Sequence, residues 1–102
     1  MKFYFYFPIR ECTAATHRAT DSINRLANSK KNLQLSFDQD YPNRIRVQTQ
    51  MGNISRASFY LKERTPLVEE QVDEFNELLS KNPIVLAVAI ADTVCITVVT
   101  ED

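Results

Sequence analysis

Hydrophobic and polar residues alternate along several short stretches of the chain, and two longer stretches between them repeat at helical spacing. A period of two is typical of a strand with one buried face, whereas apolar residues three or four positions apart indicate an amphipathic helix. Residues 2–7 are the clearest strand, because three phenylalanines alternate with Lys2, Tyr4 and Tyr6 before Pro8 ends the stretch. The pattern predicts a buried phenylalanine face and an exposed face with two tyrosines.

Two helices are predicted. The first runs from about Thr13 to Asn28, and its apolar positions recur at helical spacing: Cys12, Ala15, Ala19, Ile23 and Leu26. The second begins at Thr65, an N-cap residue followed by proline at the first helical position, and it ends before Asn82 and Pro83. Its predicted core stripe is Val68, Val72, Phe75 and Leu79.

The other predicted strands are 32–37, 44–50, 54–62, 84–91 and 93–100, with turns at 38–43 and 51–53. The stretch 84–91 is continuously apolar, which predicts a strand that is central in its sheet or covered on both faces. No internal repeat, linker or low-complexity segment is recognisable in the sequence.

The element order β-α-β-β-β-α-β-β predicts a single α+β domain over residues 1–102. We expect two helices packed on one face of a five- or six-stranded, mostly antiparallel sheet, in a ferredoxin-like arrangement with one added hairpin. A membrane span over 84–99 is not expected, because the stretch is short for a bilayer, β-branched and interrupted by Asp92.

The cysteine count bears on the cellular location, and the charge distribution bears on the kind of partner. Two cysteines are too few for a disulfide scaffold, and the N-terminus lacks a signal-peptide pattern, so a cytoplasmic location is expected. Residues 1–62 hold ten Lys and Arg against four Asp and Glu, while residues 63–102 hold two against nine. This separation of +6 from −7 points either to a charged partner or to one solvated acidic helix.

If both helices cover one face of the sheet, the other face collects aromatic and cationic side chains. The candidate contacts are Tyr4, Tyr6, Arg44, Arg46, Arg56 and Tyr60. Such a face suits bases stacked on aromatic rings with phosphates held by arginine, and it equally suits a protein interface or a solvated sheet. A homodimer that covers this face is a further alternative.

The second helix carries five carboxylates within nine residues, at Glu69, Glu70, Asp73, Glu74 and Glu77. They can present a negative face to a basic protein, including one that handles nucleic acid, or they can simply keep the helix soluble. The preferred hypothesis is a non-enzymatic inhibitor, immunity or regulatory factor that contacts another protein. The alternative is a single-stranded nucleic-acid-binding protein that uses the Tyr/Arg face.

Catalysis is not expected, and neither a cofactor nor a metal is expected. One glycine excludes a phosphate-cradling loop, and one histidine with two distant cysteines is a poor set of zinc ligands. Cys12 is expected to pack as a small hydrophobe with His17 rotated away from it, and Asp38, Asp40 and Asn43 are expected to form a turn rather than bind a cation.

Overall fold

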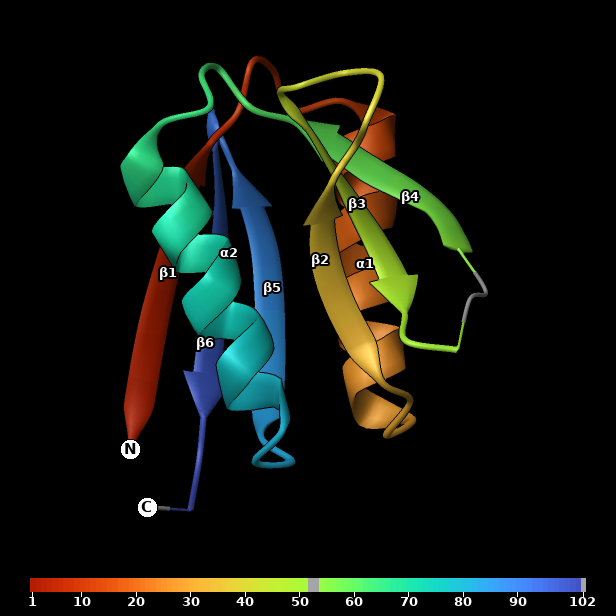
Figure 1. Ribbon diagram of the computed structural model, residues 1–102, viewed down its shortest axis with the longest axis vertical. Helices are drawn as coiled ribbons and strands as arrows, with labels where there is room; N and C mark the ends of the chain where they lie inside the picture. The colour runs from red at the N-terminus through yellow and green to blue at the C-terminus, as the bar shows by residue number, and fades with distance from the viewer. Residues whose placement is uncertain (52–53, 102) are drawn as a thin grey trace.

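The computed structural model describes residues 1–51 and 54–101, and it has two helices and six strands in the predicted order (Figure 1). The elements are β1 (Lys2–Pro8), α1 (Ala14–Asn28), β2 (Leu33–Phe37), β3 (Arg44–Thr49), β4 (Ile54–Tyr60), α2 (Pro66–Leu79), β5 (Ile84–Ile90) and β6 (Thr93–Val99). The predicted α+β class and antiparallel pairing are confirmed. Of the predicted turn at 51–53, positions 52 and 53 lie outside the described residues.

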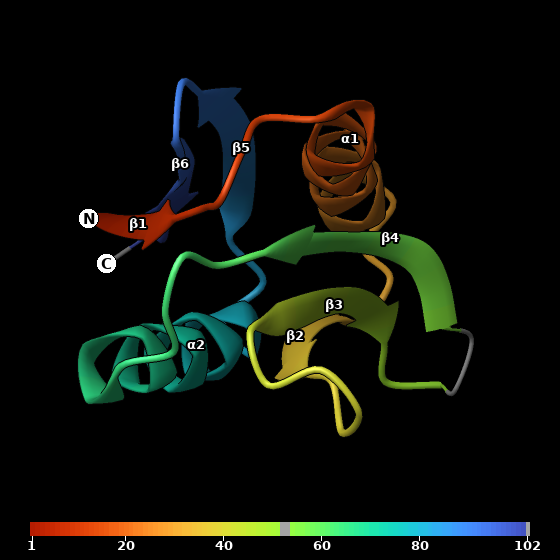
Figure 2. The same ribbon diagram turned by 90° about the horizontal axis from the view of Figure 1, so that it is seen from above.

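The prediction of one sheet with both helices on one face is wrong. The strands form two three-stranded antiparallel sheets, in the orders β1-β6-β5 and β2-β3-β4. Seen from above, the sheets lie on opposite sides of the molecule, and each helix fills one gap between them (Figure 2). α1 packs against β5 and β4, and α2 packs against β2 and β1. Sheets and helices together enclose one core, and the predicted ferredoxin-like arrangement is not confirmed.

The position predicted for 84–91 is also wrong. β5 is an edge strand, and β6 is the central strand between β5 and β1. Val85 and Ala87 point into the core, but the alternate residues of β5 point outward and are exposed. The continuous apolar run therefore supplies two different surfaces. Its inward side chains belong to the core, and its outward side chains face solvent.

The two halves of the chain have the same topology, although the sequence shows no recognisable repeat. Each half is a β-α-β-β unit: β1-α1-β2-β3 and then β4-α2-β5-β6. Exchanging each element for its counterpart converts the order β1-β6-β5 into β4-β3-β2, which is the order of the other sheet. The fold is thus a pseudo-twofold assembly in which the first strand of each half joins the hairpin of the other half.

Up to residue 37, the end of β2, each residue has its equivalent in the other half 52 positions further along the chain. Ile9 pairs with Leu61 in an antiparallel bridge, and the flanking hydrogen bonds, Arg10 N–H to the Tyr60 carbonyl and Lys62 N–H to the Pro8 carbonyl, exchange under the same shift. Both helices begin at a threonine N-cap, Thr13 and Thr65. Identical pairs up to residue 37 are few, which explains why the repeat is invisible in the sequence: Phe7/Phe59, Glu11/Glu63, Thr13/Thr65, Asp21/Asp73, Asn24/Asn76 and Leu26/Leu78.

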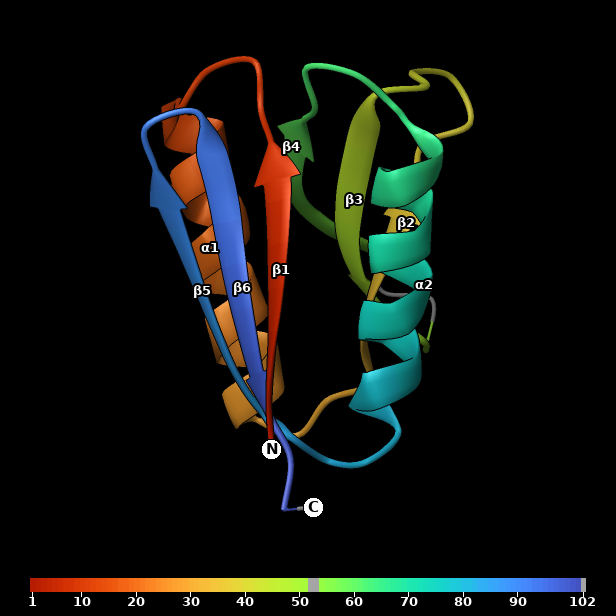
Figure 3. The same cartoon turned by 90° about the vertical axis from the view of Figure 1, so that its left-hand side faces the viewer.

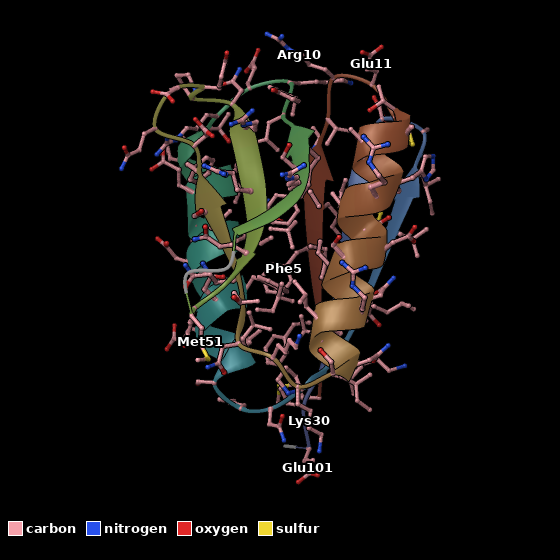
Figure 4. All side chains as sticks on the ribbon, turned by 90° about the vertical axis from the view of Figure 1, so that its right-hand side faces the viewer. Phe5, Arg10, Glu11, Lys30, Met51 and Glu101 are labelled. Carbon is pink, nitrogen blue, oxygen red and sulfur yellow. The ribbon has the colours of Figure 1, made fainter. Side chains whose placement is uncertain are left out.

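The core lies between the two sheets and follows the predicted patterns. Phe7 and Phe59, which are equivalent in the two halves, are both fully buried and their ring centroids are 6.0 Å apart. Phe5 lies in the interior, where its ring meets that of Phe75 edge to face at 5.9 Å (Figure 4). Such edge-to-face pairs stabilise beyond the area they bury. Phenylalanines from both halves thus form one contiguous core, which neither half encloses alone.

Side-chain amides attach the helices to the sheet edges. Asn24 of α1 donates to the Ala87 carbonyl at 3.1 Å and accepts from the Ala87 N–H at 2.8 Å. Asn76 of α2 makes the equivalent pair with Leu35 of β2, at 2.8 and 2.9 Å. Gln71 adds a third such pair, with the backbone of Tyr6 in β1. Each amide satisfies both backbone groups that an edge strand would otherwise leave open.

Both helices are followed by a residue in the left-handed backbone region, at the equivalent positions Lys30 and Asn82. After α1 the Lys30 N–H bonds to the Ala27 carbonyl and the Lys31 N–H to the Leu26 carbonyl. This is the Schellman pattern, in which the left-handed position usually holds glycine. Lysine at φ 56° therefore carries backbone strain.

Removing one of the edge amides is expected to destabilise the fold. In an Asn76→Ala variant the Leu35 N–H and carbonyl lose their partners, and we expect the free energy of unfolding to fall by about 2–3 kcal/mol. Urea unfolding checks this, and exchange of the Leu35 amide hydrogen should accelerate. Glu77→Ala, an exposed change one residue along the same helix, is the control and should cost less than about 0.5 kcal/mol. Equal losses in both variants would contradict a special role for the amide.

Relieving the strain at Lys30 is expected to stabilise the fold. Glycine adopts the left-handed region without the steric penalty of a side chain, so Lys30→Gly should raise the free energy of unfolding by about 0.5–1 kcal/mol. Lys30→Ala removes the same charge but keeps the Cβ atom, and it should give no increase. Thermal unfolding of the two variants beside the wild type distinguishes a backbone effect from a charge effect.

Candidate binding surfaces

The structure divides the predicted Tyr/Arg face between the two sheets. Tyr4 and Tyr6 point outward from β1, whereas Arg44, Arg46, Arg56 and Tyr60 belong to β3 and β4 in the opposite sheet. Since the outer faces of the two sheets lie on opposite sides of the molecule, no single ligand platform contains all six residues (Figure 2). The expectation of a common face followed from the expected single sheet, and it is wrong for the same reason.

On the outer side of the β2-β3-β4 sheet, the buried carboxylate of Asp38 organises the arginines. Arg44 binds Asp38 Oδ2 through Nε at 3.0 Å and also through Nη2, and Arg46 Nη1 lies 3.6 Å from the same oxygen. Asp38 Oδ1 accepts the N–H groups of Asp40 and Tyr41 at 2.7 and 3.1 Å. The predicted turn role of Asp38 is confirmed, and the hydrogen bond from Arg44 lowers the pKa of its carboxyl group.

The aromatic side chains of this face are occupied by Arg44. Its guanidinium lies 4.8 Å from the ring centroid of Tyr41 and 6.0 Å from that of Tyr60, and Nη1 donates to the Tyr60 hydroxyl at 3.3 Å. These contacts fix the orientation of the Arg44 guanidinium. Its positive charge interacts with the two rings and is therefore less available to a ligand. A base that stacked on the same side of either ring would compete with Arg44.

A second cationic group lies beside this face, along the contact between α1 and β4. A cleft there is lined by Arg18, Asp21, Arg25 and Arg56. Asp21 lies between Arg18 and Arg25 on α1 and offsets part of their charge. The cleft is too open to enclose a small molecule, but its cations extend the basic surface of the β2-β3-β4 sheet.

The outer side of the β1-β6-β5 sheet is an extensive apolar surface, which sequence reasoning missed. Its large side chains are between 42% and 69% exposed: Tyr4, Tyr6, Ile84, Leu86, Val88 and Ile90. We call these residues, with the half-buried outward side chains of β6 between them, the apolar face. In Figure 3 its three strands lie side by side, with α1 behind them. The signal in the sequence was the unbroken apolar run of β5, which was interpreted as burial.

The acidic side of α2 is exposed as predicted. Glu69, Glu70, Asp73, Glu74 and Glu77 all reach solvent. Glu69 accepts from Arg64 Nε at 3.1 Å, and none of the other four carboxylates makes an ion pair within residues 1–51 and 54–101. Their charge is therefore exposed to solvent.

The prediction that His17 is rotated away from Cys12 is wrong. Cys12 Sγ lies 3.2 Å from His17 Nε2. The helical spacing does not apply, because Cys12 precedes the N-cap Thr13, and that position normally contacts the fourth helical residue, here His17. Arg64 and Glu69 stand at the equivalent positions of α2 and form an ion pair. The Cys12–His17 contact thus belongs to the start of the helix.

The described residues show neither a metal site nor a membrane-spanning helix. They contain no group of three or more His, Cys, Asp or Glu side chains that could hold a metal ion. None of their helices has both the length and the hydrophobicity that crossing a membrane requires. Comparison of the chain with protein-family models, with curated proteins and with solved structures finds no match, so the surfaces themselves carry the functional argument.

The ion pairs of Asp38 predict a pH-dependent contribution to stability. Because its pKa is lowered in the folded protein, this contribution is present above its ordinary value of 3.8 and is lost as the pH falls through the folded-state value. Asp38→Asn should therefore lower the free energy of unfolding at pH 7, and its difference from the wild type should shrink in acid. Urea unfolding at pH 7 and at about pH 2.5 measures this. Asp40→Asn, in the same loop but exposed, is the control; an equal effect there would contradict the assignment to Asp38.

Proposed function

We propose that the protein is a small non-enzymatic binding protein that acts as an inhibitor, immunity or regulatory factor. In this proposal the acidic side of α2 contacts a basic surface of another protein and blocks it sterically. The supporting observation is that Glu70, Asp73, Glu74 and Glu77 are exposed on one helix without an ion-pair partner in the described part of the chain. Solvated carboxylates of this kind are available to an incoming cationic surface.

The charge layout supports steering of such an encounter. α2 carries five carboxylates and no Lys or Arg, whereas β3, β4 and α1 carry arginines, and α1 lies in the opposite gap between the sheets (Figure 2). The protein therefore has an uneven distribution of charge, with an acidic helix and basic strands, although its net charge is only −1. A dipolar protein turns its acidic side toward a cationic partner before contact, which raises the association rate. A partner that normally binds nucleic acid presents such a surface, and a cytoplasmic setting is part of the same proposal.

Single-strand nucleic-acid binding is the competing function, and one observation favours it. Arg56 on β4 joins Arg18 and Arg25 of α1 at the cleft beside the sheet. However, Tyr4 and Tyr6 lie on the opposite sheet, and Arg44 already contacts Tyr41 and Tyr60. Base stacking normally supplies much of the affinity in such sites. We therefore place the protein-binding function first.

Neutralising the acidic side of α2 tests the proposal. In a variant with Glu70→Gln, Asp73→Asn, Glu74→Gln and Glu77→Gln, the helix keeps its shape but loses four charges. Proteins retained by the wild type from a cell extract should be lost from this variant. With a retained protein in purified form, the association rate should fall about tenfold or more, and its dependence on salt should weaken.

A matched control removes four exposed carboxylates elsewhere: Glu11, Asp21, Asp40 and Glu63, each changed to its amide. It has the same net charge as the test variant and should retain the partner. Equal loss in both variants would reduce the effect to net charge, and equal retention would exclude α2 as the contact. Salt-sensitive binding of a random oligonucleotide pool, lost on Arg56→Gln, would favour the competing function.

A further inference from the structure

The pseudo-twofold relation makes each sheet a comparison for the other. Leu86 and Val88 on β5 occupy the places that Gln34 and Ser36 occupy on β2. On the first strand of each half, Tyr4 and Tyr6 correspond to Arg56 and Ser58, which stand 52 positions further along the chain. The same backbone arrangement therefore forms with polar outward residues in one sheet and apolar residues in the other. Folding does not require the apolar face, so another cause must explain it.

The size of the apolar face matches what one partner contributes to a stable interface. A large side chain presents on the order of 200 Å² when fully exposed. At 42–69% exposure, the six large side chains of the apolar face present on the order of 700 Å² together. A standard interface buries about 800 Å² per partner, and monomers rarely expose a contiguous apolar patch of more than a few hundred Å². The half-buried side chains of β6 supply the remaining area.

The chemistry of the apolar face specifies its partner. Lys2 is the only charged residue in β1, β5 or β6, and it lies at one corner, in register with Val99 and Ile84. A partner with a charged surface would gain no ion pairs here and would lose solvation. The face is also the broad side of a sheet, so a flat apolar surface fits it best.

We propose that the apolar face is the interface of a homodimer, with the β1-β6-β5 sheets of two copies packed face to face around a twofold axis. A second copy supplies an identical flat, uncharged surface, and a twofold interface needs only this one surface. Pairing edge to edge is opposed, because Gln71 and Asn24 already bind the backbone edges of β1 and β5. Two sheets in this arrangement pack about 10 Å apart.

The two copies place the central strand of each sheet at the middle of the interface. Cys95 lies on β6, in register with Tyr6 on one side and Val88 on the other, and its side chain belongs to the apolar face. The dimer therefore covers Cys95. Cys12, which lies beside the start of α1, stays outside it. The interface uses no carboxylate of α2, so a result that contradicts the dimer would not contradict the proposed function, and the reverse also holds.

Sedimentation equilibrium between about 1 and 100 μM tests the dimer. The wild type should approach twice the chain mass of 11.8 kDa. Leu86→Gln with Val88→Ser places on β5 the residues that β2 carries at equivalent positions, so the fold should persist and the dissociation constant should rise at least about 30-fold. Leu67→Gln changes a similarly exposed leucine on α2 and should leave the dissociation constant within about twofold.

Alkylation of the two cysteines gives a second measurement that does not depend on a variant. Modification of Cys95 by a maleimide should slow at about 100 μM protein relative to about 1 μM, while modification of Cys12 should not change. A wild type that stays monomeric throughout, or a Cys95 rate independent of concentration, would overturn the proposal. A dimer that Leu86→Gln with Val88→Ser leaves intact would overturn it as well, because the interface would then lie elsewhere.

Discussion

β1 pairs with β6 and β4 pairs with β3, so the first strand of each half of the chain joins the hairpin of the other half and not its own. Neither β-α-β-β unit can build a sheet of three strands from its own residues. The helices follow the same rule, since α1 lies between two strands of the second half and α2 between two of the first. Asn24 and Asn76 fix these crossed contacts by binding one edge-strand residue each from the opposite half. Each half therefore completes the sheet of the other.

The local elements were predictable because local rules dominate them. The alternation of apolar and polar residues predicted which side of β1 is buried, and Thr65 with Pro66 predicted where α2 begins. The arrangement of the sheets was not predictable, because the exchange of strands depends on contacts far apart in sequence, and only six of the positions 52 residues apart are identical up to residue 37. β5 shows most clearly what the sequence pattern cannot distinguish. A strand with an exposed apolar face has the same pattern of apolar residues as a strand that is buried on both faces. Cys12 shows it at a smaller scale, since helical spacing fails for a residue that precedes the N-cap.

The candidate surfaces were predictable in composition but not in placement. Every acidic residue expected on α2 is exposed there, because a single helix needs only its own periodicity to separate its two sides. The Tyr/Arg face required knowledge of which strands are neighbours, and that knowledge was missing. The three surfaces that result, one acidic, one basic and one apolar, lie on different helices and sheets around the core. Such separation allows each to evolve a different contact without disturbing the core that all of them share.

The position of β6 has a consequence for how the chain folds during synthesis. β6 is the central strand of its sheet, and it leaves the ribosome after both of its neighbours, β5 and β1. Until it emerges, Phe5 and Phe7 on β1 have no strand beside them, and more than ninety residues separate Phe3 from its partner Val98. Contacts this distant in sequence close slowly. During translation β1 therefore remains an aromatic strand without its partner until β6 has been synthesised, which makes β1 a segment that a chaperone would protect.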